Sequence, residues 1–157
     1  MKKPVLISLL ALILCAAIAI AVLMLRSAQP SLFDHPENAA STDQYTARSF
    51  VSTALDNSIR GTLDFTGAVT LWQYNAAGEQ PLSITCALTI REGAVKLVAY
   101  DENGGMAELL SQSASSGLNG AASVLNASLH PGMNTVKLIG ARNTKLDFEF
   151  TFAPGTP

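Results

Sequence analysis

Few side chains in this sequence combine a reactive type with a spacing that favours catalysis. The histidines are His35 and His130, and the cysteines are Cys15 and Cys86. No His-x-x-x-His or Glu-x-x-His pattern, P-loop or Gly-x-Ser-x-Gly motif occurs. His35 lies in an Asp-His-Pro-Glu run, where a solvated histidine is favoured over a metal ligand because the segment has no rigid element. The sequence therefore predicts no metal site, no cofactor and no catalytic residue.

Two groups of acidic side chains allow weak alternatives. Asp147 and Glu149 are two residues apart and would share the outward face of one strand, where acids ordinarily serve solvation. Asp101, Glu102 and Asn103 resemble a calcium-binding run, but Asn103-Gly104 is already explained as a hairpin turn. Neither group favours an enzyme, and we predict that the protein is not one.

The best candidate ligand contacts are two aromatic side chains, Trp72 and Tyr74. If Leu63, Phe65, Val69 and Leu71 face the core, Trp72 and Tyr74 lie side by side on the opposite face. Flat exposed rings suit the C–H faces of sugars, so the pair is a candidate platform for a glycan. In one alternative, a bulge at Gly67 reverses the parity and buries Trp72. In another, the pair packs under the loop at 111–122.

The elements that position these residues are strands. Apolar residues alternate with polar ones over 82–90 and again over 146–152, the pattern of a strand with one buried face. Cys86 has inward parity in the first of these, which predicts a buried thiol and not a nucleophile. Further inward pairs are Val95 with Leu97 and Val136 with Leu138. Turn signals at 91–93, 102–105 and 131–132 separate the strands.

Seven or eight short strands with turns every 8–12 residues predict an all-β, antiparallel β-sandwich of the jelly-roll kind. We expect this domain over 48–153, with a tail at 154–157, and a stalk at 27–47 that mixes Pro, Ser, Ala and acids. Within the stalk, residues 41–44 also resemble a capping box. A short helix there competes with a first strand at 48–55.

The amino-terminal segment predicts a membrane location. Residues 4–25 are an uncharged, almost wholly apolar run, which as a helix would be about 33 Å long and would cross a hydrocarbon core of ~30 Å. We expect a single-pass signal anchor over 1–26. Lys2 and Lys3 precede the run, and no Lys or Arg occurs between Arg26 and Arg48. This asymmetry favours a cytoplasmic amino terminus and an extracytoplasmic domain.

Two other interpretations of this segment stay open. Ala17-Ile18-Ala19 fits a signal-peptidase site, although cleavage there would leave an apolar mature end. Leu12-Ile13-Leu14 before Cys15 partly resembles a lipobox, which would make the protein a lipoprotein. The length of the run favours the uncleaved anchor.

Charge excludes one class of partner. The first 26 residues hold three of the ten basic side chains and none of the twelve acidic ones. The remainder therefore carries seven basic and twelve acidic groups, a net charge of −5. An acidic surface of this kind disfavours nucleic acid.

The run from Ala127 to Leu138, followed by Lys145 to Phe148, resembles the late strands of galactose-binding-like jelly rolls, which include many carbohydrate-binding modules. Residues 90–97 are similar to their central hairpin. The chain also resembles small membrane-anchored extracytoplasmic proteins of Gram-positive bacteria. This resemblance implies a fold and, by analogy, a sugar ligand. We therefore predict a structural or protein-interaction role at the cell envelope, with a carbohydrate- or cell-wall-binding module as the alternative.

Overall fold

The computed structural model describes residues 31–116, 120 and 122–156. The predicted anchor at 1–26, with its alternatives, lies outside these residues. Within the described ranges, no helix reaches the length and apolar character that a membrane crossing requires.

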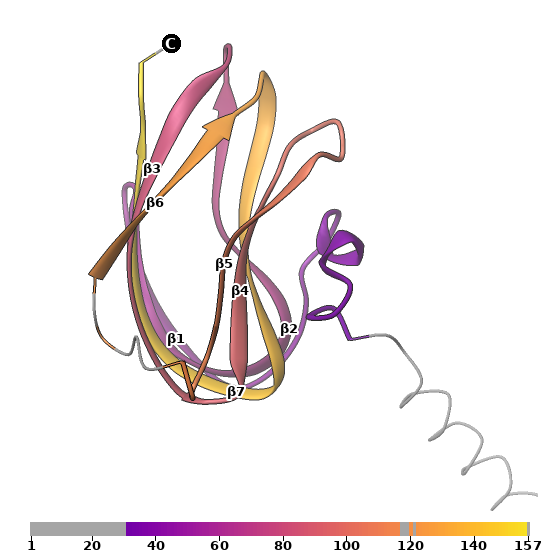
Figure 1. The fold of residues 1–157 in the computed structure, drawn as a ribbon, viewed down its shortest axis with the longest axis vertical. Helices are drawn as coiled ribbons and strands as arrows, with labels where there is room; N and C mark the ends of the chain where they lie inside the picture. Colours follow the sequence, from indigo (N-terminus) through magenta and orange to yellow (C-terminus); the bar gives the residue numbers. More distant parts are fainter. Residues whose placement is uncertain (1–30, 117–119, 121, 157) are drawn as a thin grey trace, which may run out of the picture. The chain divides into compact units, whose positions relative to one another are not determined.

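The described residues form seven strands and one short 3₁₀ helix (Figure 1). In chain order they are η1 (Pro36–Ala39), β1 (Gln44–Leu55), β2 (Ser58–Ala76), β3 (Gln80–Glu92), β4 (Ala94–Tyr100), β5 (Met106–Ser113), β6 (Ala122–Leu129) and β7 (Gly132–Pro154). Every strand pair is antiparallel.

The longest strand, β7, belongs to both layers of the fold. Its first part, residues 132–140, pairs with β2 and β4, and its second part, residues 144–154, pairs with β2 and β3. Between Gly140 and Thr144 the β2–β7 register shifts, and Asn143 adopts a positive φ of 57°. The first layer therefore contains β4 and β5, and the second contains β3 and β6, with β1 and β2 passing through both. This arrangement confirms the predicted all-β antiparallel sandwich.

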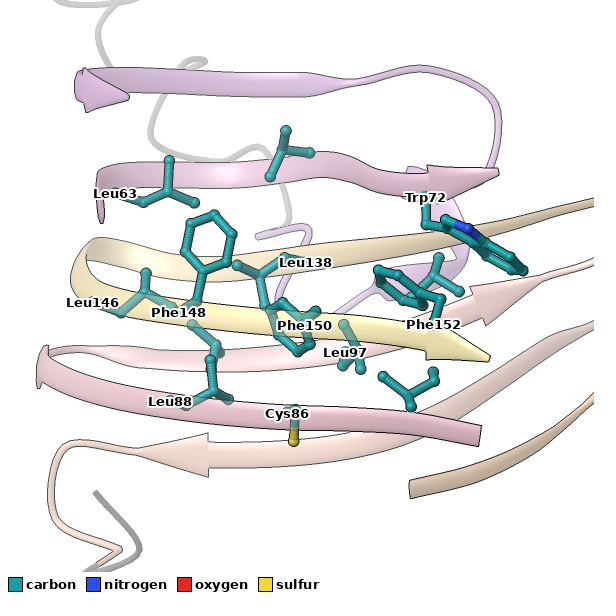
Figure 2. Close-up of a cluster of buried hydrophobic side chains, with 14 of the residues drawn as sticks. Leu63, Trp72, Cys86, Leu88, Leu97, Leu138, Leu146, Phe148, Phe150 and Phe152 are labelled. Carbon is teal, nitrogen blue, oxygen red and sulfur yellow. The ribbon is translucent and has the colours of Figure 1, made fainter. Parts of the chain in front are cut away.

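The core lies between the two layers (Figure 2). The alternation predicted over 82–90 is confirmed, because all five apolar side chains of that run are buried. The four apolar positions over 146–152 and the inward pairs of β4 and β7 are buried as well. Cys86 is 2% exposed, with its Sγ 3.0 Å from Ser123 Oγ, as its parity predicted. These residues bury apolar surface on one face of each strand. The removal of this surface from water is the main contribution to the stability of such a domain.

The described part of the predicted stalk lies against the domain, and its role as a linker stays a prediction. Residues 31–43 pack on the outer face of the first layer, where Leu32, Phe33 and Ala39 contact Val98 and Ile139. Capping-box residues 41–44 start no helix, because β1 begins at Gln44, four residues earlier than expected. The sequence contained one indication that another segment covers the outer face of β4. Residues 94–100 of β4 are apolar on both faces except for one lysine, which is typical of a strand buried on both sides.

The loop expected at 111–122 is shorter than predicted, because β5 extends to Ser113 and β6 begins at Ala122. Gly67 marks an irregularity, as expected. Its φ is 114°, and a side chain there would collide with the backbone of Gln44 on β1. Only glycine adopts this conformation without strain, so Gly67 allows β1 to approach β2 closely.

Candidate binding site

Trp72 does not face solvent, which corrects the expected orientation of the aromatic pair. The β2–β7 register shifts between Thr70 and Trp72, so that Leu71 is an extra residue on β2. This bulge reverses the side-chain parity, and Trp72 becomes a core residue that is 8% exposed. The alternative interpretation placed this bulge at Gly67, and the structure places it a few residues later, at Leu71.

Trp72 and Tyr74 remain neighbours inside a stack of three rings. The Trp72 ring centroid lies 5.3 Å from that of Tyr74 and 5.0 Å from that of Phe152, with interplanar angles of 6° and 8°. Figure 2 shows Trp72 and Phe152 side by side at one end of the core. Tyr74 is half-buried against the same core. Ligand binding by this pair stays a prediction, and Tyr74 is the more accessible of the two residues.

A charge pair joins the 31–43 segment to the sheet, between the partly exposed Asp43 and the buried Lys137, and no pattern in the sequence indicated it. The Lys137 side chain is 3% exposed, and its Nζ lies 3.1 Å from Asp43 Oδ1. Thr70 also donates to this carboxylate through its backbone N–H and its hydroxyl. Burial would raise the pKa of Asp43, but the hydrogen bonds from Thr70 and the Lys137 charge outweigh it and hold the pKa below its usual value. Because every charge here has a partner, the cluster fastens the segment to the sheet.

Tyr100 makes a second attachment of this segment. Its hydroxyl donates to the Pro36 carbonyl oxygen at 2.6 Å, and the residue is 5% exposed. Burial raises the pKa of Tyr100 to about 12, with the Glu37 charge adding to the effect. The tyrosine therefore stays neutral and acts as a hydrogen-bond donor in the packing of η1.

A cavity of about 220 Å³ lies between the β4–β5 loop and the start of β7. Its polar lining residues include Asp101, His130 and Asn134. Asn134 is buried and bonds the backbone of His130, and Asp101 accepts the N–H groups of Asn103 and Gly105. These groups serve the turns that carry them, which fits the turn role predicted for Asn103-Gly104.

Of the two carboxylates considered for catalysis, Asp147 has structural partners. Asp147 accepts hydrogen bonds from Thr62 at 2.7 Å and from Arg91 at 2.9 Å. The part of the chain that the structure describes contains no group of three His, Cys, Asp or Glu side chains arranged to hold a metal. Nothing in this geometry assigns a catalytic role to these acids.

The accessible apolar surface instead gathers on β1. All twelve residues of this strand are exposed, and among the described residues its only strand partner is β2. The large apolar side chains of β1 are Tyr45 (47% exposed), Phe50 (40%), Val51 (66%) and Leu55 (66%). The strand carries a single charge, Arg48, and no proline. Natural sheet edges are ordinarily protected by charge, proline or short length, and β1, with twelve residues and one charge, is an open edge.

Two aromatic rings on β1 lie against each other. The centroids of Tyr45 and Phe50 are 5.9 Å apart at an interplanar angle of 28°. Phe50 pairs across the strands with the core residue Leu63, so it lies on the core face at the margin of the sandwich. Nearby, a hollow of about 330 Å³ is lined by Val51, Ser52, Arg60, Gly61 and Glu149, among others. Sequence analysis missed this surface, although apolar residues at both parities of 44–55 were the signal for it.

Comparison with known proteins gives distant likenesses to solved structures, among them the three that follow with their identity and coverage. No family model matches the chain, and no curated protein matches it in sequence. A family 29 carbohydrate-binding module complexed with mannohexaose has a TM-score of 0.42 and 10% identity, covering 71% of this chain and 82% of that one. The same module complexed with cellulohexaose has a TM-score of 0.42 and 12% identity, covering 78% and 89%. TmCBM61 in complex with β-1,4-galactotriose has a TM-score of 0.43 and 11% identity, covering 82% and 97%.

These neighbours include carbohydrate-binding modules, the class that the sequence resembles. With TM-scores below 0.5, neither the fold nor a ligand of this chain follows from them. The sandwich described above rests on its own strand pairing and core.

Proposed function

We propose that residues 31–157 form a non-catalytic binding domain that docks a protein partner along β1. The observation that carries this proposal is an open strand edge with four exposed large apolar side chains. Such an edge offers a row of backbone N–H and C=O groups, to which an extended segment of a partner adds as a further strand. The apolar side chains supply the contact area, and the hydrogen-bonding groups of the β1 backbone set the orientation of the added strand.

Glycan binding is the second candidate, and the stacked Tyr45–Phe50 pair favours it. Two exposed rings in near-parallel planes offer apolar faces to a pyranose ring. The two functions need different parts of β1. A sugar needs the rings and is indifferent to the free backbone edge. A strand-forming partner needs an edge that no charge blocks.

The location of the domain is part of the proposal. The uncharged run at 4–25 and the positive charges before it support a single-pass anchor with the domain outside the membrane. We therefore expect the full-length protein to stay in the membrane pellet after alkaline carbonate washing, and external protease to remove the domain from intact cells. Recovery of a soluble mature protein that begins near Ile20 would contradict the anchor.

The experiment compares two lysine variants of the immobilised domain. It measures how much protein each variant captures from an envelope extract and how strongly each variant is retained on cell-wall polysaccharide. Val51→Lys places a charge on the β1 edge, and the control Val124→Lys places one on β6, where the valine is similarly exposed at 62%. We expect Val51→Lys to abolish protein capture and Val124→Lys to retain it. Equal capture by both variants would contradict docking at β1.

A ring-removal variant tests the second candidate. Tyr45→Ala/Phe50→Ala removes the stacked pair and leaves the strand without any added charge. Retention of the wild-type domain on polysaccharide, lost in this variant and kept in Val51→Lys, would establish glycan binding in place of a protein partner.

A further inference from the structure

The free edge of β1 has features that suit a second copy of the same strand. Residues 49–55 form a run without charge, proline or glycine, beyond the register shift between Ala47 and Ser49. All residues of the run are exposed. An edge this long and uncharged is the kind that pairs with another chain.

Two copies of this run are complementary when they pair antiparallel about Ser52. In a paired sheet, each residue must lie opposite a residue whose side chain is on the same face. A two-fold axis through Ser52 meets this condition, because every pair it forms differs by an even number of residues and side chains alternate between faces with period two. Phe50 then lies opposite Ala54, and Val51 lies opposite Thr53. A large ring is thus placed beside a small side chain, and two β-branched residues meet on the outer face.

The same register brings opposite charges together at both ends of the run. Arg48 and Asp56 flank residues 49–55, and both are exposed. With Ser52 on the two-fold axis, the long Arg48 side chain at the bulge of each copy comes to the end of the run where the other copy's Asp56 begins the turn after β1. Opposite-charge pairs of this kind fix the register and disfavour slipped alternatives. No like charges meet within the run, because it has none.

The area available fits a weak dimer. The three exposed large apolar side chains of the run, Phe50, Val51 and Leu55, leave on the order of 300 Å² free per copy, to which the two strand backbones add. The total for both copies stays below the ~1,200 Å² at which stable specific interfaces begin, in the range of weak and transient association. Such a dimer forms at high concentration and dissociates on dilution.

We propose that β1 docks a second copy of this chain, in an antiparallel pair centred on Ser52 that joins the two sandwiches into one continuous sheet. This inference rests on the proposed function, because it names the occupant of the docking edge.

Single cysteines test the register in the fragment 31–157, which forms a compact unit with its own core and lacks Cys15. The remaining native thiol, Cys86, is buried. Under mild oxidation, Ser52→Cys should give a disulfide-linked dimer, because the two introduced thiols face each other across the two-fold axis. The matched variant Ser49→Cys should not cross-link alone, but it should cross-link when mixed with Leu55→Cys. Cross-linking by Ser49→Cys alone, or by none of these, would overturn the pairing.

Sedimentation of the wild-type fragment from about 1 µM to about 1 mM tests the association itself. We expect the weight-average mass to rise toward that of a dimer. Arg48→Glu, which faces Asp56 with a like charge, should raise the concentration at half-association about tenfold or more. Val124→Lys should leave it unchanged.

A monomer over this whole range would overturn the second copy as the occupant. If Val51→Lys still abolished capture of an envelope protein, docking at β1 would stand with a different partner. If Val51→Lys changed neither association nor capture, the second copy and the proposed function would both fail.

Discussion

β7 and β1 are both long antiparallel strands that pass through both layers of the sandwich, yet their surroundings are opposite. β7 has a strand on each side along most of its length. Its side chains are buried on both faces over 136–140 and alternate between buried and accessible over 144–154. β1 has β2 on one side only, and every one of its residues is exposed. A strand's neighbours, more than its own apolar content, decide whether its side chains stabilise the domain or remain available to a partner.

The largest test of this contrast uses the same substitution in both strands. Phe150 on β7 is fully buried, and Phe50 on β1 is 40% exposed. Phe150→Ala should lower the free energy of unfolding by about 3–5 kcal/mol, because it leaves a cavity between the layers. Phe50→Ala should cost only about 1–2 kcal/mol, since the ring is partly hydrated already. Chemical denaturation of the fragment measures both, and equal losses would remove the distinction.

A smaller loss tests the attachment of the 31–43 segment. Asp43→Asn removes the partner of the buried Lys137 ammonium and should cost on the order of 3 kcal/mol. Lys137→Met together with Asp43→Asn should recover much of this, because no buried charge is then left unpaired. If the single and double variants were equally destabilised, the ion pair would not be the cause.

The same carboxylate predicts a dependence on pH. Its folded-state pKa lies below the ordinary 3.8, so its contribution is present above that value and is lost as the pH falls through the lower folded value. Wild-type stability should therefore decrease between about pH 5 and pH 2 more steeply than that of Asp43→Asn. Thermal melts of both proteins across this range make the comparison, and parallel curves would contradict it.

The next effect concerns the thiol of β3. Cys86→Ser places a hydroxyl among apolar neighbours and should destabilise by about 1–3 kcal/mol. Its contact with Ser123 Oγ offers one hydrogen-bond partner, which favours the lower end of that range. Rapid reaction of Cys86 with a thiol reagent in the folded domain would contradict its burial.

The smallest effect on stability is expected at the open edge. Val51→Lys should change the free energy of unfolding by no more than about 0.5 kcal/mol, because the side chain is already two-thirds exposed. Its effect should fall on association instead. A large loss of stability would mean that Val51 packs within the monomer and is not a docking residue.

Regular alternation made the centre of the fold predictable. Over 82–90 and 146–152 the apolar positions repeat with period two, and such a pattern buries one face whatever strand lies alongside. The turns at 91–93 and 102–105 were predictable as well, because their glycines and asparagine favour a positive φ. These local features are sufficient for fold class.

The candidate site was harder to predict, because it depends on long-range pairing. The extra residue at Leu71, which turns Trp72 inward, exists only relative to the facing residues of β7. Apolar residues on both faces of 44–55 were a signal for β1, but a strand buried on both sides has the same composition.

Residue order was enough to predict an antiparallel β-sandwich with a buried thiol, an acidic surface and an apolar run at its amino terminus. The folded chain was needed to show that residues 31–43 cover the first layer, that Trp72 belongs to the core, and that β1 is left open. This division arises because period and turn chemistry act between near neighbours, whereas cover, register and free edges depend on which distant strands meet.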